Sequence, residues 1–298
     1  MNLGYACINT ALSANKIFTN RTMRRKTFDA NGEDYVSDLA LANVKDLKII
    51  IQWNNEMKIK LFRLSSQIFP WSDEYDVKGL KDYDEIAELM LEIGKIAKDA
   101  GQRLTMHPGP YNCLASPTQK VVEKTIRELN FHSEQFNMMG YDPSPYNKIN
   151  IHVGGAYGDK KGTLDAFCHN FKLLNEDTKK RLVIENDDSP NEYSVNDLYW
   201  GIHKRIGIPI TFDYFHHKFN TGTLTEEEAL RMAATTWPKE ITQCCHYSES
   251  RRKEKLDESI RPQAHSDIIY NKINTYGLNP DIVIEAKLKE QSIFNYAK

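Results

Sequence analysis

Residues that ligate metal ions recur in this chain, each directly after a short apolar run of the kind that forms a β-strand. His107, His152 and Glu185 end three such runs. The corresponding places in later runs are taken by Asp213, His216, His246 and Glu285. Imidazole and carboxylate groups together accept divalent ions such as Mn²⁺, Zn²⁺ or Fe²⁺. The pattern therefore predicts a metal site, provided that the fold brings these strand ends together.

The elements that must position these residues alternate along the chain. Strand-like runs lie at 1–6, 60–64, 103–106, 149–152, 182–185, 208–213, 240–246 and 281–284. Helical periodicity marks the segments 34–56, 82–100, 118–139, 163–175 and 194–204, and another helix begins near residue 223. This alternation predicts an α/β fold, a single (β/α)8 TIM barrel domain over residues 1–298. A doubly wound open sheet is the alternative, but its site draws on fewer strands.

A barrel gathers the C-terminal ends of its strands at one face, where barrel enzymes carry out their chemistry. Taken singly, each histidine is as readily a hydrogen-bonded polar residue, and the spacing of Asp213 and His216 arises often by chance. Equivalent placement in consecutive units is what favours a metal cluster at this face. The histidines within helical segments are interpreted as structural or solvent-exposed, namely His132, His169 and His203.

The composition is that of an ordinary globular protein, with 40% hydrophobic and 27% charged residues and a net charge of −2. A uniformly basic nucleic-acid-binding coat is therefore excluded, but the basic segments 20–26 and 251–253 remain either contacts for a polyanion or solvated surface. The five cysteines include no CxxC pair and are interpreted as reduced thiols. Because no membrane-spanning run and no signal-peptide pattern occur, we expect a soluble intracellular protein.

Several motifs occur along nearly the whole chain in the order typical of one known family. They are Gly4 and Tyr5 with Asn9, Asn-Arg-Thr at 20–22, Arg-Leu-Ser-Ser at 63–66, Met-His-Pro-Gly at 106–109, Ile-His-Val-Gly-Gly at 151–155, Val-Ile-Glu-Asn-Asp at 183–187, Phe-Asp-Tyr-Phe-His-His at 212–217, His-Tyr-Ser at 246–248 and Ile-Glu-Ala-Lys at 284–287. In these motifs the chain resembles the ultraviolet-damage endonucleases. The resemblance implies a barrel enzyme that nicks DNA on the 5′ side of cyclobutane pyrimidine dimers and 6-4 photoproducts, without ATP, and so initiates excision repair.

The same resemblance implies a set of site residues and cofactors. The matching metal ligands are His107, His152, Glu185, Asp213, His216, His246, His265 and Glu285. We expect two or three divalent ions, Mn²⁺ first, with Mg²⁺, Zn²⁺ or Co²⁺ as alternatives. Tyr5, Asn9 and Tyr111 match positions at the lesion-binding face. The implied partner is ultraviolet-damaged double-stranded DNA, with no membrane, and we expect a monomer.

Phosphodiester hydrolysis assigns roles within this set. Glu185, Asp213 and Glu285 are expected to anchor or bridge the ions, which activate water and stabilise the leaving oxygen. Lys287 is placed to contact the scissile phosphate or to pair with a nearby carboxylate. The expected products carry 3′-hydroxyl and 5′-phosphate ends. Phosphates of the DNA backbone are expected to bind the basic N-terminal segment through Arg21, Arg24 and Arg25.

Three positions depart from the family pattern. Pro110 stands where the family usually has a lesion-probing glutamine, and Cys244 where it often has a metal-bridging lysine. A family histidine after the second strand is missing, with Asp73 or Glu74 as the nearest replacement. Three alternatives to the expected activity remain: a related three-metal abasic-site endonuclease, a metal-dependent sugar isomerase, and a non-catalytic lesion-binding protein.

Overall fold

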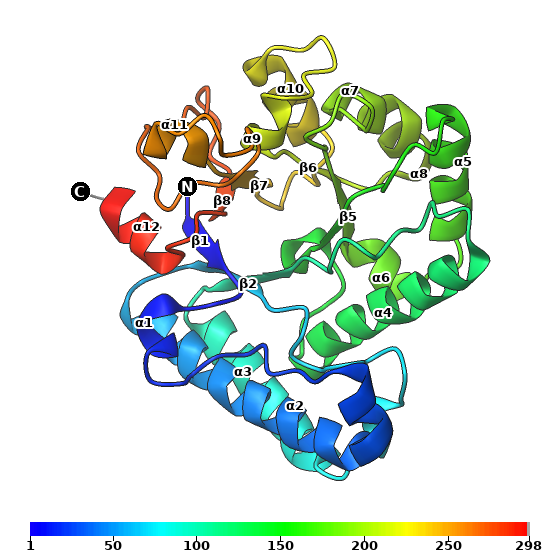
Figure 1. Ribbon diagram of the computed structural model, residues 1–298, viewed down its shortest axis with the longest axis vertical. Helices are drawn as coiled ribbons and strands as arrows, with labels where there is room; N and C mark the ends of the chain where they lie inside the picture. Colours follow the sequence, from blue (N-terminus) through cyan, green and yellow to red (C-terminus); the bar gives the residue numbers. More distant parts are fainter. Residues whose placement is uncertain (297–298) are drawn as a thin grey trace.

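The computed structural model of the protein describes residues 1–296 and shows eight parallel strands surrounded by helices (Figure 1). The strands are β1 (Leu3–Ala6), β2 (Leu61–Leu64), β3 (Arg103–Met106), β4 (Ile149–Ile151), β5 (Leu182–Glu185), β6 (Ile210–Thr211), β7 (Cys244–Tyr247) and β8 (Asp281–Ile284). Their order in the sheet is β6-β5-β4-β3-β2-β1-β8-β7. The predicted (β/α)8 barrel is therefore confirmed, and the last two residues of the expected 1–298 domain lie outside the described part.

The sheet closes between β6 and β7, and this join is narrow. It consists of a parallel bridge between Asp213 and His246, with the His246 amide donating to the Phe212 carbonyl at 2.9 Å. By contrast, β7 pairs with β8 through four consecutive residue pairs. The barrel is therefore weakly paired at this seam, and two of the expected metal ligands lie on it.

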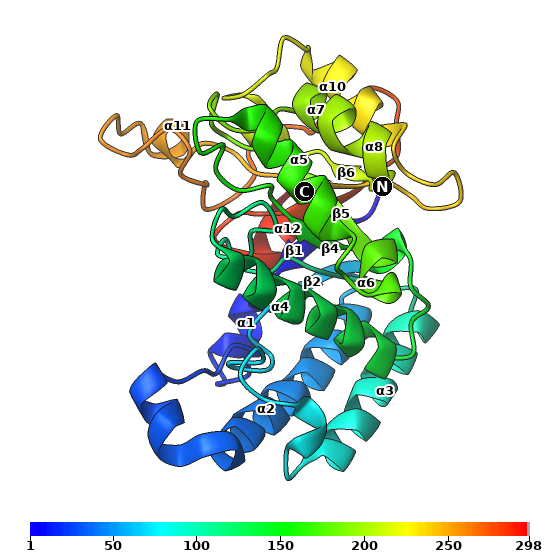
Figure 2. The same cartoon turned by 90° about the vertical axis from the view of Figure 1, so that its right-hand side faces the viewer.

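The helices form the outer layer of the barrel. They are α1 (Thr10–Ser13), α2 (Arg25–Glu56), α3 (Tyr83–Asp99), α4 (Gln119–Met138), α5 (Lys160–Phe171), α6 (Glu176–Arg181), α7 (Val195–Leu198), α8 (Lys204–Ile206), α9 (Tyr214–His217), α10 (Glu226–Ala234), α11 (Arg251–Lys255) and α12 (Glu290–Tyr296), with short helices at Val77–Gly79 and Pro145–Asn147. A π-helical turn, Tyr199–His203, joins α7 to α8, so the helix expected at 194–204 is in three parts. The long helices α2 and α3 lie side by side on the outside of the barrel, at the bottom of Figures 1 and 2.

Glycines end the two helices that the sequence predicts most clearly. Gly101 follows α3 with φ of 62°, and Gly140 follows α4 with φ of 70°. This left-handed conformation stops a helix and suits glycine, which has no Cβ to clash with the backbone. Both helices thus end where the sequence predicts, so the strands after them begin at the right place.

Side chains alternate along each strand, so they pack either inside the barrel or in the core between the barrel and the helices. Inward-facing side chains from five different strands form a small apolar cluster in the middle of the barrel, namely Ala6, Leu61, Val183, Cys244 and Val283. Outward-facing neighbours such as Phe62, Ile184 and Ile284 join the larger core beneath the helices. Because side chains alternate along a strand, the residues two positions beyond the apolar cluster again point inward, at the C-terminal mouth.

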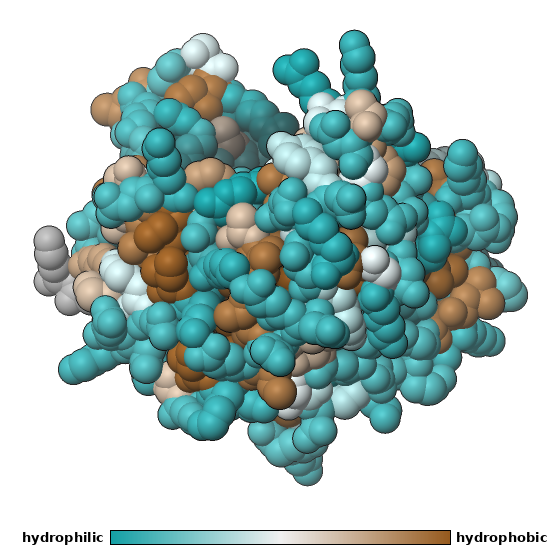
Figure 3. All heavy atoms as spheres, turned by 90° about the horizontal axis from the view of Figure 1, so that it is seen from below, coloured by the Kyte–Doolittle hydropathy of each residue, from teal (hydrophilic) through white to brown (hydrophobic). Residues whose placement is uncertain are grey.

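None of the helices in residues 1–296 has the length and hydropathy needed to cross a membrane. The face drawn in Figure 3 is mostly hydrophilic, with hydrophobic side chains in separate patches between the polar ones.

Candidate metal centre

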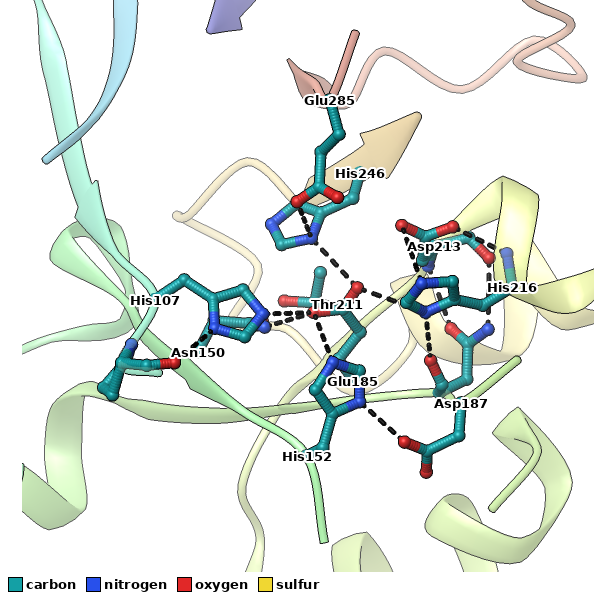
Figure 4. Close-up of polar contacts among 12 residues, drawn as sticks. His107, Asn150, His152, Glu185, Asp187, Thr211, Asp213, His216, His246 and Glu285 are labelled. Carbon is teal, nitrogen blue, oxygen red and sulfur yellow. Dashed lines mark hydrogen bonds and ion pairs between the residues drawn. The ribbon is translucent and has the colours of Figure 1, made fainter. Parts of the chain in front are cut away.

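The C-terminal mouth of the barrel is organised around one buried carboxylate, Glu185, the last residue of β5. Its side chain is 1% exposed and faces four imidazoles (Figure 4). The Oε2 atom lies 3.2 Å from His107 Nε2 and 3.7 Å from His152 Nε2. The Oε1 atom lies 3.0 Å from His246 Nδ1 and 3.6 Å from His216 Nδ1. Residues predicted from four separate strand ends therefore meet at a single point.

The strand pattern explains why these side chains converge. Met106 and Ile151 end β3 and β4 in the core beneath the helices, so the next residues, His107 and His152, turn toward the barrel axis. Pro108 and Gly109 then turn the chain away from the rim, and Gly109 lines the cavity. The local sequence therefore leaves the imidazoles at the mouth of the barrel and not under a helix.

A second carboxylate, Glu285, extends the cluster on the β8 side. Its Oε1 lies 3.4 Å from His246 Nδ1, and its Oε2 lies 3.7 Å from His265 Nδ1. Arg63 of β2 forms an ion pair with the same carboxylate from inside the barrel. The imidazole of His265 also contacts the Glu285 backbone carbonyl at 2.9 Å. His265 thus lies at the edge of the cluster, and its role as a metal ligand stays a prediction.

Asp213 carries one oxygen without a hydrogen-bond partner among the described residues, although His216 Nε2 lies 4.0 Å from it. Its Oδ1 accepts hydrogen bonds from the amides of Phe215, at 2.7 Å, and His216, at 2.8 Å, and so caps α9. Its Oδ2 is buried and has no hydrogen-bond partner among the described residues. An unpaired buried carboxylate oxygen is costly, so a ligand at this position would be stabilising.

The donor atoms form two groups that could hold a metal ion, and Glu185 belongs to both. The ligand atoms of two groups each lie within 4.8 Å of one another: the first group is His107, His152 and Glu185, and the second is Glu185, Asp213 and His246. Mixed imidazole and carboxylate ligands suit Mn²⁺, Fe²⁺, Co²⁺ or Zn²⁺. The residues therefore fit the metal cluster that the sequence led us to expect.

The electrostatics of the mouth differ sharply from one imidazole to the next. Burial lowers the pKa of His107, and it lowers that of His246 to about 3. Burial also acts against the charge of His152, but Glu185 and Asp187 outweigh it and raise the pKa to about 10. For His216, Asp213 and Glu185 likewise outweigh burial and raise the pKa to about 9. Without metal, the mouth therefore holds protons at His152 and His216.

The positive charges of these two protonated imidazoles lie next to negatively charged carboxylates. Burial opposes ionisation of Glu185, yet the neighbouring imidazoles of His246 and His152 hold its pKa well below the ordinary value. A metal ion that binds imidazole nitrogen must displace the proton from it. In the metal-free protein, the positive charges of His152 and His216 thus balance the negative charges of the carboxylates, as bound metal ions would.

The structure adds supporting residues that the sequence reasoning did not assign. Asp187 Oδ1 lies 2.7 Å from His152 Nδ1, so it orients the ring with Nε2 toward Glu185. Asn150 of β4 donates from its amide to the Glu185 carboxylate, and Lys148, which directly precedes β4, reaches into the barrel. The signal was present in the spacing, since residues 148, 150 and 152 alternate along β4 and its two flanking positions.

Two of the expected lesion-binding residues lie in the interior. Tyr5 and Asn9 are both 0% exposed. The Tyr5 hydroxyl donates to Asn54 of α2 at 2.6 Å and accepts from Asn9 at 2.9 Å. The strand alternation turns Tyr5 outward beneath α2, so the expectation of a lesion contact is corrected for both residues. Tyr111, in contrast, is 89% exposed in the loop after β3.

The basic residues expected to bind phosphates are not equivalent. Arg21 is paired with Asp46 at 2.6 Å and donates to two backbone carbonyls, so its charge supports the fold. Arg25 forms exposed ion pairs with Asp29, at 2.8 Å, and Glu74, at 2.9 Å. Arg24 is exposed and precedes α2. Of the three arginines, Arg24 is the one with no ion pair within residues 1–296.

The structure also shows where the residues that depart from the family pattern lie. Cys244 is 0% exposed in the apolar cluster, one inward-facing position below His246. Asp73 pairs with Lys124 at 3.0 Å and Glu74 with Arg25, so neither replaces the missing histidine in the cluster. Lys287 is exposed and its side chain makes no ion pair within the described part of the chain. Its contact with a phosphate stays a prediction.

A cavity of about 490 Å³ opens directly onto the cluster. Its walls include His107, His152, His216 and His265 together with Pro110 and Asp188. The loop after α11, which projects from the barrel in Figure 2, contributes Arg261 and Gln263. A substrate that enters this cavity would meet the imidazoles first and the buried carboxylates behind them.

The fold and the site together define the class of protein: a (β/α)8 barrel with a buried histidine and carboxylate cluster at the C-terminal ends of its strands. The family model described as UV-endonuclease UvdE matches residues 1–298. The chain belongs to this family of UV endonucleases.

Individual relatives agree with this assignment. The chain is 36% identical to the UV-damage endonuclease of Schizosaccharomyces pombe over 99% of its own length, but it spans only 50% of that protein. It is 32% identical to the putative UV-damage endonuclease of Acanthamoeba polyphaga mimivirus, and the match covers 98% of this chain and 89% of the viral protein. The crystal structure of SacUVDE matches with a TM-score of 0.85 and 30% identity, covering 99% of this chain and 96% of that one.

More distant barrels share the fold alone. Endonuclease IV from Thermus thermophilus matches with a TM-score of 0.59 at 10% identity, covering 100% of this chain and 98% of the other. D-psicose 3-epimerase from Clostridium cellulolyticum matches with a TM-score of 0.55 at 12% identity, covering 95% of this chain and 84% of the other. The barrel by itself therefore does not distinguish a nuclease from a sugar epimerase.

Proposed function

We propose that this protein is a metal-dependent endonuclease that cuts duplex DNA on the 5′ side of ultraviolet photoproducts. The observation that carries the proposal is Glu185, a carboxylate shared by two groups of potential metal ligands in a chain that belongs to the UV-endonuclease family. Cyclobutane pyrimidine dimers and 6-4 photoproducts are the proposed lesions. The protein is expected to act as a monomer and without ATP.

The protein's own residues would hold and orient the reacting groups. Glu185 would hold metal together with His107 and His152 in one group of ligands, and with Asp213 and His246 in the other. Divalent ions in such a centre activate water and neutralise the negative charge that develops at phosphorus. Asp187 fixes the His152 ring, so the imidazole needs no reorientation when an ion binds.

The β8 side of the cluster is held by a charge pair. Arg63 compensates the charge of Glu285 from inside the barrel. Burial and the proximity of Arg63 act in opposite directions, and the net effect keeps the Glu285 pKa well below its usual value. Glu285 is therefore available as an anionic ligand at neutral pH, as the proposed role requires.

Lesion recognition is proposed for the rim above the cavity. Dimerised pyrimidines stack poorly, so turning them out of the helix costs less than for normal bases. Tyr111 is exposed between Pro110 and Asn112, which both line this cavity, and supplies a flat aromatic surface for stacking. Because Tyr5 and Asn9 are buried, Tyr111 is the aromatic probe that we propose. Arg24 is the proposed phosphate contact of the N-terminal segment.

The experiment uses an end-labelled duplex with one cyclobutane dimer, metal-stripped protein and added Mn²⁺. We expect one cut 5′ to the dimer, with 3′-hydroxyl and 5′-phosphate ends, and none in chelator. Matched duplexes carry an abasic site or no lesion. Cutting only at the abasic site would assign the protein to the related repair activity and overturn the proposal.

A further inference from the structure

One fully buried lysine in the barrel interior takes no part in the proposed chemistry. Lys148 precedes β4 and is 0% exposed. Its Nζ donates to Thr211 Oγ1 at 2.9 Å and to Asn150 Oδ1 at 3.2 Å, and it lies 2.9 Å from His246 Nε2. A lysine is rarely buried unless its amino group is fully paired, and here three partners surround it.

The partners of Lys148 lie on three different strands. Thr211 belongs to β6, His246 to β7 and Asn150 to β4. Within residues 1–296, the seam between β6 and β7 consists of the Asp213–His246 bridge, with the hydrogen bond from the His246 amide to the Phe212 carbonyl. The amino group of Lys148 therefore fastens this seam from the inside, directly below the ligands that the two strands carry.

The contact with His246 fixes which ring nitrogen faces the cluster. Nε2 is turned to Lys148, while Nδ1 points to Glu185 at 3.0 Å and to Glu285 at 3.4 Å. Turning the ring over would remove the Lys148 contact and point Nδ1 away from both carboxylates. Because a charged lysine can only donate, Nε2 accepts from the Lys148 amino group and Nδ1 carries the proton that faces Glu185.

The contact with Asn150 likewise fixes the orientation of the Asn150 side-chain amide. Lys148 donates to Oδ1, so the amide NH₂ group must face the other direction, where it donates to Glu185. If the amide were reversed, two donors would face each other at Lys148 and two acceptors at Glu185. A single amino group thus orients both an imidazole and the carboxylate shared by the two ligand groups.

We propose that Lys148 is a positioning residue of the metal centre, which sets the ring of His246 and, through Asn150, the carboxylate of Glu185. This inference rests on the proposed function for its effect on DNA cutting. Its effect on metal binding is independent of that function. No other described residue connects both ligands to the β6–β7 seam through one side-chain group.

The test compares Lys148→Met, which keeps the length of the side chain but removes its hydrogen bonds, with Cys245→Ala as the control. Cys245 is buried on β7 and belongs to the core beneath the helices. Metal-stripped proteins are titrated with Co²⁺ alone, and affinity, stoichiometry and the visible spectrum are recorded. We expect Lys148→Met to bind Co²⁺ at least tenfold more weakly with an altered spectrum, as for other supporting residues of metal sites. Cys245→Ala should bind as the wild type does.

A second variant keeps the proposal testable if Lys148→Met does not fold. Thr211→Val removes one partner of Lys148 and touches no expected ligand through its hydroxyl. We expect a smaller loss of Co²⁺ affinity, and a double variant no weaker than Lys148→Met alone, because both changes act through one amino group. Additive losses, or a Lys148→Met protein with wild-type affinity and spectrum, would overturn the inference.

Nicking of the dimer-containing duplex separates the two proposals. If the wild type cuts, we expect Lys148→Met to lower kcat at least tenfold with KM for the duplex nearly unchanged. If the wild type does not cut the dimer at all, the proposed function fails, while the Co²⁺ titrations still decide the role of Lys148.

Discussion

The contact between Asp187 and His152 gives the sharpest quantitative expectation. Asp187 is 6% exposed, and its Oδ1 lies 2.7 Å from His152 Nδ1. Replacing Asp187 by alanine removes the acceptor that keeps Nε2 directed at Glu185, and it also removes a negative charge that favours bound cations. Loss of such a partner typically weakens metal binding 10- to 100-fold, or about 1.4–2.7 kcal/mol.

The chain supplies both a graded variant and a matched control. Asp187→Asn keeps an acceptor oxygen but not the charge, so its loss should be smaller than that of Asp187→Ala. Asp188 is the next residue, lines the same cavity and makes no hydrogen bond with a histidine within residues 1–296. Asp188→Ala should therefore retain the metal affinity of the wild type.

The assay is calorimetric titration of metal-stripped protein with Mn²⁺, accompanied by thermal melts in chelator. The melts matter because Asp187 Oδ2 also accepts from the Tyr193 amide at 3.3 Å, so part of the effect of alanine is on the loop. A wild-type Mn²⁺ affinity in Asp187→Ala, with the protein folded, would refute the reasoning that this contact positions His152.

Three further predictions concern charge and the rim. The pKa values of His152 and His216 are raised to about 10 and about 9, so the metal-free protein should lose stability as pH rises from about 6.5 to about 10. The affinity for Mn²⁺ should rise over the same pH range, because the imidazoles lose the protons that compete with the metal. Thermal melts and Mn²⁺ titrations that show the opposite trends would contradict the assigned protonation. Tyr111→Ala should weaken binding to dimer-containing duplex by about 1–3 kcal/mol and leave undamaged duplex almost unaffected, measured by fluorescence anisotropy. Arg24→Ala should reduce the salt dependence of DNA binding by about one phosphate contact. Arg21→Ala should instead lower the melting temperature, because its charge is paired with Asp46; equal effects of the two changes on binding would contradict this distinction.

Much of the site could be predicted from the apolar runs in the sequence and from the way a parallel barrel gathers its strand ends at one face. His107, His152 and Glu185 end apolar runs, and parallel strands of a barrel carry their ends to one face. The convergence of the ligands therefore required no knowledge of the individual contacts. The same reasoning located His246, which lies on β7, and Glu285, which directly follows β8.

The supporting residues could not be predicted in the same way, because their roles depend on neighbours distant in the sequence. Lys148 gains its role only when Thr211 and His246 are brought to its amino group from two other strands. Tyr5 was misplaced for a related reason. Its motif matched, but the side of the strand that it occupies is decided by packing, and Asn54 of α2 holds its hydroxyl in the interior.

Nicking of supercoiled plasmid tests the central claim most directly, namely that the cluster around Glu185 is a metal centre that cuts damaged DNA. Irradiated and unirradiated plasmid are incubated with the wild type, with and without chelator, and with Glu185→Gln. We predict that only irradiated plasmid is nicked, that chelator abolishes nicking and added Mn²⁺ restores it, and that Glu185→Gln still binds damaged DNA without cutting it. Undiminished nicking by Glu185→Gln, or by wild type in chelator, would contradict the account.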